Sequence, residues 1–348
     1  MFQQYFFEGS YREVGRQYGE QFRNDLVEWN ERQHKALSDQ FDISDALTSE
    51  MIFSYEKICK QYAPGLVEQL LGMAEGANIT FEDAMLFQVN AEIGNELKNQ
   101  VPECTSFVIP SEYTSNGKSY SGQNADMWPS YADKCSVVTF AVTGKPRITY
   151  LLPIGYLSYH GMNSEGISCN HNALFGSTWK KGLPRFFVSR MALECNSLHE
   201  IKQFIDGIDY IASRHTLFAD RDGNTISYEF DSKHTGVTTC SGKAFVHTNH
   251  YLCSEMLKYE TISTEDHCNS EMRLNQMKAL IEKLKGQISV EEIKTMLRNH
   301  ENGENSICVH GFKDKIYTFA SIINCLCDGK ILIARGNPCE SDYVSYSV

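Results

Sequence analysis

The stretch VPECTSFVIP, residues 101–110, contains the residue on which the interpretation of the whole chain depends. Cys104 follows Pro102 and Glu103 and precedes an alternating run of apolar and polar residues that is typical of a β-strand. It is therefore an ordinary buried thiol, a nucleophile at the end of a strand, or a new N-terminus that forms when the chain is cut before it. The remainder of the sequence distinguishes between these interpretations.

Length and composition are those of a soluble globular protein. The chain has 348 residues, of which 42% are hydrophobic and 22% charged. Its net charge of −12 argues against nucleic acid or an anionic membrane surface as a partner. No linker rich in Pro, Gly or Ser divides the chain, so we expect one domain over residues 1–348. Residues 1–15 lack the regions of a secretory signal, and no apolar stretch is long enough to span a membrane.

The cysteines indicate a reducing compartment. There are 12, scattered along a chain that is too long for a small secreted disulfide scaffold. We therefore expect free thiols and a cytoplasmic location. The close pair Cys325-Leu-Cys327 lacks a second cluster at zinc-site spacing, so we expect no metal and no other cofactor.

Residues 1–100 are predicted to be mainly helical. An apolar stripe at helical spacing consists of Val14, Tyr18, Phe22, Leu26 and Trp29. A further helix is expected to begin with Thr48 or Ser49 as its N-cap and to end before Pro64. The pair Thr80 and Asp83 has the spacing of a capping box at the start of another helix.

From residue 104 onward the pattern changes to strands. Alternating segments separated by turn signals extend to residue 175, and a helix is predicted over 187–207. Strands follow, with a hairpin turn at Asp222-Gly223; then come two helices and a final hairpin about Asp328-Gly329. Long antiparallel runs interrupted by helices favour stacked sheets covered by helices over repeated βαβ units.

A thiol nucleophile needs a base and donors for the oxyanion that forms. The histidines offer several bases, of which His171, His247 and His250 lie in polar motifs, but no single one stands out. The alternative base is the free α-amine of the nucleophile itself, whose ordinary pKa of about 7.7–8 is close to working pH. Cleavage of the Glu103–Cys104 bond would create that amine at the tip of a strand.

Five motifs in order resemble a known family. They are GSYREVGRQYGEQF (9–22), PECTSF (102–107), GQNADMWP (122–129), GMNSEGISCNHNAL (161–174) and VHTNHY (246–251). Together they resemble the acyl-coenzyme A:6-aminopenicillanic acid acyltransferase family. This family is a branch of the N-terminal-nucleophile hydrolases and is similar to the choloylglycine hydrolases. The resemblance extends to the terminal GNP (336–338) and so covers nearly the whole chain.

The resemblance implies an α+β fold, the four-layer αββα sandwich of the N-terminal-nucleophile hydrolases. It also implies a precursor that cuts itself before the nucleophile, with the cleaved chains 1–103 and 104–348 remaining associated. The family's catalytic residues correspond here to the nucleophile, the acid that orients it, the oxyanion-hole asparagine, a second asparagine and an arginine near the site: Cys104, Asp126, Asn249, Asn172 and Arg273.

The scissile bond departs from the family pattern. The penicillin-forming member has glycine before the cysteine, whereas this chain has Glu103, a bulkier and charged residue that would slow self-cleavage. The implied substrate is a small-molecule acyl amide or acyl thioester. Trp128, Tyr131 and Phe175 are the candidates for the lining of its acyl pocket.

We therefore expect a self-processing cysteine hydrolase that acts on a linear amide bond through a Cys104 acyl-enzyme. One alternative is an acyltransferase that passes the acyl group from a thioester or amide to an amine. A second is a Cys–His hydrolase that needs no processing. A third is a catalytically silent, uncut precursor that acts as a binding protein.

Overall fold

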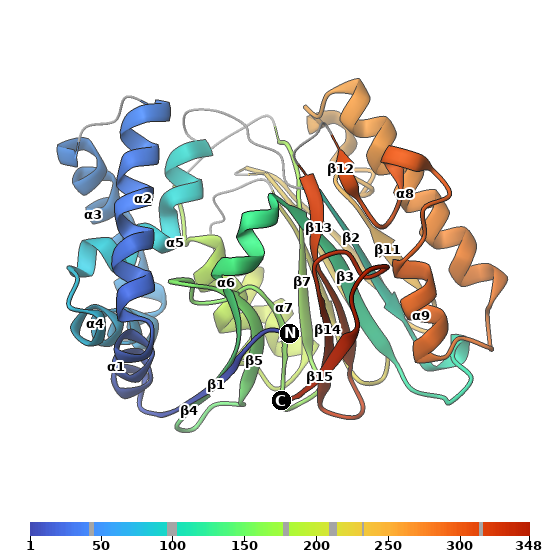
Figure 1. Ribbon diagram of the computed structural model, residues 1–348, viewed down its shortest axis with the longest axis horizontal. Coiled ribbons are helices and arrows are strands. Elements are labelled where there is room, and N and C mark those ends of the chain that lie inside the picture. The colour runs from blue at the N-terminus through green and yellow to red at the C-terminus, as the bar shows by residue number, and fades with distance from the viewer. Residues whose placement is uncertain (42–44, 96–102, 177–180, 209–213, 232, 313–315) are drawn as a thin grey trace.

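Four layers of secondary structure make up the molecule (Figure 1). The computed structural model describes residues 1–348 except 42–44, 96–102, 177–180, 209–213, 232 and 313–315. In the described part of the chain, helices cover the outer faces of two sheets that pack against each other. The αββα sandwich is therefore confirmed.

The helices fall into two outer layers. The layer against the first sheet consists of α1 (Tyr11–Gln21), α2 (Arg23–Phe41), α3 (Asp45–Tyr62), α4 (Pro64–Ala77), α5 (Phe81–Asn95), α6 (Arg185–Leu193) and α7 (Leu198–Ile205). The layer against the second sheet consists of α8 (Thr264–Lys283) and α9 (Val290–Leu297). Short 3-10 helices are η1 (Ser111–Tyr113), η2 (Pro129–Lys134), η3 (Leu257–Tyr259) and η4 (Gly303–Asn305).

In the described residues the first sheet has eight strands in the order β1-β4-β5-β6-β7-β8-β9-β10. They are β1 (Gln4–Gly9), β4 (Cys135–Val142), β5 (Ile148–Pro153), β6 (His160–Asn163), β7 (Ser168–Ala173), β8 (Arg214–Ala219), β9 (Thr225–Phe230) and β10 (Thr235–Cys240). The second sheet has the order β11-β2-β3-β13-β14-β15, with β12 paired to β13. Its strands are β2 (Glu103–Ile109), β3 (Tyr120–Met127), β11 (Phe245–His247), β12 (His310–Phe312), β13 (Ile316–Cys325), β14 (Lys330–Arg335) and β15 (Tyr343–Ser347).

The N-terminus differs from the helical expectation. β1 lies at the edge of the first sheet and pairs in parallel with β4, so Phe7 lies opposite Phe140. The helix begins only after Ser10, whose hydroxyl accepts a hydrogen bond from the Glu13 N–H in a capping box. A six-residue strand with a partner 133 residues away carries too little local signal to be separated from the helix that follows.

The motif at residues 9–22 proves to be a helix-packing element. α1 and α4 approach so closely that a methyl group on Gly15 or Gly19 would run into the backbone carbonyls of α4. The reverse holds for Gly72 and Gly76, which face carbonyls of α1. Two glycines one turn apart on each helix thus permit backbone contact.

Two predicted helix boundaries are wrong. α3 begins at Asp45, so Thr48 and Ser49 lie inside it, and the Ser49 hydroxyl donates to Glu82 of α5 at 3.0 Å instead of capping a helix. The helix predicted over 187–207 is two helices, because Ser197 caps a new helix, α7, with its hydroxyl. The box of Thr80 and Asp83 is confirmed at the start of α5.

β2 separates two environments. Ser106 and Val108 face the first sheet, where Ser106 reaches a side chain of β7 and Val108 joins the larger apolar core. Phe107 and Ile109 point the other way and join a second apolar core under α8 and α9. By this alternation the Cys104 side chain belongs to the face between the sheets.

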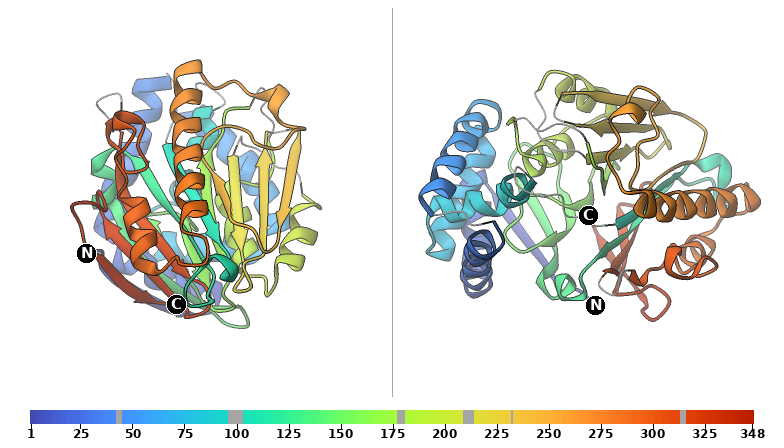
Figure 2. Two further views of the ribbon diagram at one scale, coloured as in Figure 1. Left: turned by 90° about the vertical axis from the view of Figure 1, so that its right-hand side faces the viewer. Right: turned by 90° about the horizontal axis from the view of Figure 1, so that it is seen from above.

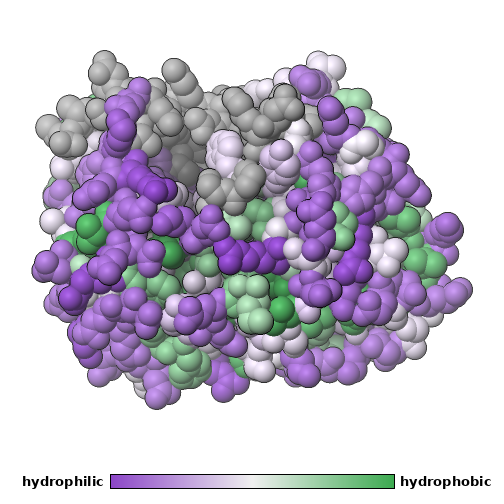
Figure 3. Space-filling view, in the orientation of Figure 1, coloured by the Kyte–Doolittle hydropathy of each residue, from purple (hydrophilic) through white to green (hydrophobic). Residues whose placement is uncertain are grey.

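The coloured part of the face in Figure 3 is mostly hydrophilic, in keeping with the net charge of −12. Among the residues that the structure describes, no helix combines the length and the apolar character needed to cross a membrane.

Candidate active site

Cys104 lies near the beginning of a central strand. It is the second residue of β2 and lies opposite Ala125 of β3 in the antiparallel pair. Its side chain is only 5% exposed. The strand therefore presents the thiol at the end of the inter-sheet space, beside residues that both sheets and α8 contribute.

Three side chains hold the Cys104 backbone. The N–H of Cys104 donates to Asn249 Oδ1 at 2.9 Å. Its carbonyl accepts from Asn172 Nδ2 at 3.0 Å and from Arg273 Nη1 at 2.8 Å. The sequence prediction placed these three residues near the nucleophile, and the structure brings all of them into direct contact with it.

Arg273 links the nucleophile to its surroundings. It is fully buried on α8, and Nη1 donates to both the Cys104 carbonyl and Thr105 Oγ1. Nη2 donates to Asn249 Oδ1 at 2.9 Å, and Nε donates to Asn269 Oδ1, one turn earlier on the helix. A guanidinium has donors in a fixed planar fork, so it sets several acceptors in one geometry.

Asn172 reaches Cys104 from the opposite sheet. It lies on β7, and its Oδ1 accepts from Ser106 Oγ at 2.6 Å and is hydrogen-bonded to His215 Nδ1 at 2.8 Å. Its Nδ2 is directed to the Cys104 carbonyl. In this state Asn172 acts on the backbone of the nucleophile, and its assignment to the oxyanion hole stays a prediction.

Asn249 is fixed from both sides of its amide. Its backbone N–H donates to Ser270 Oγ at 2.7 Å, and its Nδ2 donates to the Ala173 carbonyl at 3.2 Å. Its Oδ1 is the acceptor for the nitrogen of Cys104. The observed contact is therefore to the nitrogen that would become the α-amine on cleavage.

Asp126 is buried on β3, directly opposite Glu103 in the strand pair. Its Oδ1 accepts from Thr318 Oγ1 at 2.6 Å. Its charge helps to raise the pKa of the Cys104 thiol, while its backbone N–H and the Gln123 side chain are hydrogen-bonded to that thiol and lower its pKa. Asp126 thus lies within electrostatic reach of the sulfur.

The thiol of Cys104 is protonated in this state. Burial raises its pKa to about 12, with the Asp126 charge adding to the rise and the Arg273 charge opposing it. A thiol with such a pKa is a poor nucleophile at neutral pH until a base removes its proton. The site therefore needs a base next to the sulfur.

Two candidate histidines face other partners. His171 Nε2 lies 3.3 Å from Cys169 Sγ, and His250 Nδ1 is hydrogen-bonded to Ser270 Oγ at 2.7 Å. Within the described part of the chain no histidine ring is hydrogen-bonded to the Cys104 thiol. This geometry disfavours a Cys–His pair.

The third candidate, His247, belongs to a buried polar stack. Its Nε2 is hydrogen-bonded to the Glu229 carboxylate at 2.9 Å, and its ring stacks on His215 with centroids 3.4 Å apart. His215 in turn holds Asn172, which holds the Cys104 carbonyl. Sequence reasoning missed Glu229 and His215, although polar residues within predicted strands are a signal of such a network.

The proposed acyl-pocket residues are only partly near the site. Tyr131 is half-buried, and its ring lies 6.4 Å from that of Tyr159. Burial raises the pKa of Tyr159, and the charge of Cys104 adds to this rise, so the phenol lies within electrostatic reach of the thiol. Tyr131 therefore packs near Tyr159, which sequence reasoning missed.

Trp128 and Phe175 are not brought to Cys104 by any described contact. Trp128 is 40% exposed and precedes η2. Phe175 is buried, and its carbonyl accepts a hydrogen bond from the Thr261 N–H. Their part in an acyl pocket remains a prediction. The Glu103 side chain lies outside what the structure describes.

Comparison with known families gives one match over most of the chain. The sequence model of the family described as acyl-coenzyme A:6-aminopenicillanic acid acyl-transferase matches residues 113–340. A curated relative, the 40 kDa form of acyl-coenzyme A:6-aminopenicillanic-acid-acyltransferase from Emericella nidulans, is 25% identical over 248 residues. That alignment covers 70% of this chain and 68% of the relative.

The fold is shared with a solved structure. A mutant of the conjugated bile acid hydrolase from Clostridium perfringens superposes with a TM-score of 0.50 at 13% identity, covering 70% of this chain and 97% of the other. A structure of penicillin V acylase from Agrobacterium tumefaciens gives a TM-score of 0.39 at 11% identity, covering 68% and 77% of the two chains.

Proposed function

Because the chain belongs to the acyl-coenzyme A:6-aminopenicillanic acid acyl-transferase family, we propose that Cys104 is its nucleophile. Members of this family are enzymes of the amidase and acyltransferase class, and this chain is one of them. One observation carries the proposal. The Cys104 nitrogen, which becomes the α-amine once the chain is cut, is held by Asn249 beside the thiol. The silent binding protein is the weaker alternative, because the family consists of enzymes.

The first proposed step is self-cleavage. The Cys104 sulfur attacks the carbonyl carbon of Glu103 as its proton passes, directly or through water, to the Cys104 nitrogen; the carbon–nitrogen bond then breaks, and the nitrogen leaves as a free amine. The product is a thioester between Glu103 and the sulfur. Water hydrolyses it, which releases the Glu103 carboxylate and restores the thiol. The contacts of Arg273 and Asn172 with the Cys104 carbonyl support this step by fixing the chain on the far side of the bond.

The second step uses the new amine as a base. The α-amine takes the thiol proton as the sulfur attacks the substrate carbonyl, and it returns a proton to the leaving amine or thiol. An amine with an ordinary pKa of about 7.7–8 is partly unprotonated at neutral pH, so it can act as the general base. Asn249 is our candidate for stabilising the oxyanion, and Asp126 for orienting the amine.

The acyl-enzyme is then resolved by water or by an amine. We propose hydrolysis of a linear amide as the main reaction, because water is always present and no described group marks a second amine site. The Emericella relative is named for transfer from acyl-coenzyme A to 6-aminopenicillanic acid. Transfer to an amine therefore stays the alternative.

An acyl-enzyme experiment separates these outcomes. The protein is mixed with an acyl-coenzyme A or a linear acyl amide, quenched in acid and measured by intact mass spectrometry. We expect the acyl mass on the fragment that begins with Cys104, and its loss at equal rates with and without 6-aminopenicillanic acid if water is the acceptor. A faster loss with formation of the acylated amine would establish transfer. No adduct with any substrate of either class would count against Cys104 as the nucleophile.

We also propose a cytoplasmic location, since all twelve cysteines are free in the structure and thiols persist in reducing compartments. Cell fractionation would test it, and recovery of the protein from a secreted fraction would contradict it.

A further inference from the structure

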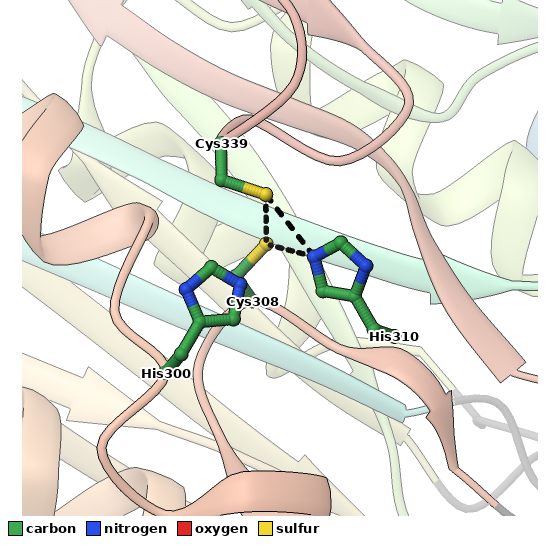
Figure 4. Close-up of side chains that lie close together, drawn as sticks. All are labelled: His300, Cys308, His310 and Cys339. Carbon is green, nitrogen blue, oxygen red and sulfur yellow. Dashed lines mark hydrogen bonds between the residues drawn. The ribbon is translucent and has the colours of Figure 1, made fainter.

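Four metal-ligating side chains converge at a place that the proposed reaction does not use. They are His300, Cys308, His310 and Cys339, and their potential ligand atoms all lie within 4.8 Å of one another. Figure 4 shows the two sulfur atoms and one nitrogen of His310 pointing to a common centre, with the His300 ring beside Cys308. We call this group the His–Cys cluster.

The fold brings the cluster together from three segments. His300 follows α9, Cys308 precedes β12, His310 is the first residue of β12, and Cys339 follows β14. The pairing of β12 and β14 with β13 places these segments side by side. The two cysteines are 31 residues apart, so no compact spacing pattern in the sequence indicates that they form one site.

Two hydrogen bonds fix the segments without using any ligand atom. The Cys308 N–H donates to the Asn299 carbonyl at 3.1 Å, which closes the loop that carries His300. Arg298 Nε donates to the Pro338 carbonyl at 2.8 Å, which ties that loop to the turn before Cys339. The side chains therefore converge on a scaffold that is already in place.

We propose that the His–Cys cluster binds one zinc ion. The two sulfurs are 3.7 Å apart, and His310 Nε2 lies 3.5 Å from Cys308 Sγ and 3.1 Å from Cys339 Sγ. Tetrahedral zinc with bonds of about 2.3 Å to sulfur and about 2.0–2.1 Å to nitrogen requires sulfur pairs about 3.8 Å apart and sulfur–nitrogen pairs about 3.5 Å apart. The observed separations are close to these values, and a set of two thiolates and two imidazoles favours zinc.

Neighbouring groups have the positions expected around such a site. With His310 Nε2 turned to the sulfurs, its Nδ1 faces the Glu340 carboxylate at 3.8 Å. Carboxylates near the second nitrogen of a metal-bound histidine orient the ring. Asn337 Nδ2 lies 3.5 Å from Cys308 Sγ and donates to the Val309 carbonyl at 2.7 Å. Asn337 belongs to the terminal GNP motif, which thereby acquires a structural explanation.

The zinc ion would be structural. Four protein ligands fill a tetrahedral site and leave no open position for a substrate. Binding releases the two thiol protons to water, so the ion, two thiolates and two neutral imidazoles form a neutral unit. The proposal does not depend on the reaction proposed for Cys104.

The cluster supports the strands around the nucleophile. Asn124 of β3 donates to the Ile307 carbonyl, next to Cys308, at 2.9 Å. Thr318 accepts from the Val309 N–H at 3.0 Å and donates to Asp126 at 2.6 Å. Zinc would therefore stabilise the loop that is hydrogen-bonded, through Thr318, to Asp126.

A disulfide between Cys308 and Cys339 is the competing use of the thiols. It would require the sulfurs to approach to about 2.05 Å, and it would give the two histidines no role. The convergence of both rings on the sulfurs favours the metal.

The test measures zinc in full-length protein purified under reducing conditions and dialysed against metal-free buffer. Zinc is determined by plasma mass spectrometry for the wild type, Cys339→Ser and His300→Ala. Both substituted positions are exposed, so these variants should fold even if Cys308→Ala does not. Cys327→Ser is the matched control, because it removes an exposed thiol from the Cys325-Leu-Cys327 pair. Cobalt titration adds a spectroscopic readout of tetrahedral thiolate ligation.

We expect about one zinc per chain in the wild type and in Cys327→Ser, and a loss of at least about ten-fold in zinc affinity in the two cluster variants. The cobalt form should show the charge-transfer band of thiolate ligation, and this band should be missing in Cys339→Ser. The proposal is overturned if the wild type holds no more zinc than Cys339→Ser and gives no cobalt–thiolate band. It is also overturned if peptide mapping of freshly prepared protein shows a Cys308–Cys339 disulfide.

Discussion

At the scale of the residue, Arg273 connects several groups of the candidate site. It is fully buried and donates to the Cys104 carbonyl, to Thr105 and to two asparagines. Buried acceptors that lose a charged donor are left without compensation, which costs about 1.5–3 kcal/mol for a hydrogen bond to a charged group. The arginine therefore contributes to folding as well as to the geometry of the nucleophile.

We predict that Arg273→Met lowers the free energy of unfolding by about 2–3 kcal/mol and slows or abolishes cleavage at Glu103–Cys104. Urea denaturation measures the first effect and the ratio of intact to cut chain measures the second. Lys283→Met, at an exposed position of the same helix, is the control and should change neither. Normal stability and normal cleavage in Arg273→Met would contradict the proposed role of Arg273 in folding and in positioning Cys104.

Sequence motifs identified the residues that contact the Cys104 backbone, but not the groups that hold those residues. Asn249 was found because it stands in a motif of the resemblance, and Arg273 because the resemblance places an arginine near the site at that position. His215 was not, because its role depends on strand register and on how the two sheets pack. The His–Cys cluster was missed for the same reason; the close pair Cys325-Leu-Cys327 was judged insufficient for zinc, and no metal was expected.

At the scale of the element, the α1–α4 contact depends on glycine. Gly15 and Gly19 face carbonyls of α4, while Gly72 and Gly76 face carbonyls of α1. Any added side-chain carbon must push the helices apart, and forcing extra volume into a packed interface typically costs about 1–3 kcal/mol.

Gly19→Ala is predicted to lower the free energy of unfolding by about 1–3 kcal/mol, even though alanine favours a helix more than glycine does. The matched control is Gly207→Ala, where the new methyl group would meet only ordinary contacts of 3.5 Å or more. Thermal denaturation of both variants provides the comparison. A Gly19→Ala protein as stable as the wild type would show that the helices are not closely packed in solution.

Local sequence signals predicted the type of most elements. Elements that depend on contacts between distant residues were not predicted. The hairpin about Asp222-Gly223 and the box of Thr80 and Asp83 were predicted correctly because each is formed by neighbours in the sequence. β1 was not, because its only sheet partner, β4, lies far along the chain. The break before α7 required recognising Ser197 as a cap inside an otherwise helical pattern.

At the scale of the whole molecule, buried histidines make stability depend on pH. Burial lowers the pKa of His160, His171 and His215 well below the ordinary value. Below about pH 6.5 the unfolded chain therefore binds protons that the folded chain does not, so the free energy of unfolding falls as pH falls. Each such histidine contributes a slope of up to about 1.4 kcal/mol per pH unit.

We expect the free energy of unfolding to decrease steadily from pH 6.5 to pH 5. His171→Gln should reduce that slope by up to about 1.4 kcal/mol per pH unit, and His199→Gln, at an exposed position, should leave it unchanged. Urea titrations at several pH values measure the slopes. Equal slopes for His171→Gln and the wild type would contradict the assignment of His171 as a neutral buried group.

The topology also predicts what happens to the pieces after cleavage. Residues before Cys104 supply β1 of the first sheet and the helices α1–α5 that cover it. Because these contacts do not depend on the Glu103–Cys104 bond, the two fragments should migrate as one species in native gel filtration and separate only in denaturant. Dissociation under native conditions would contradict this expectation.

The most direct test of the central claim is the intact mass of the purified protein under denaturing conditions, beside that of Cys104→Ala. We predict two fragments that divide between Glu103 and Cys104 for the wild type, and one uncut chain for the variant. A single full-length mass for the wild type that persists on prolonged incubation would contradict the claim that Cys104 frees its own α-amine.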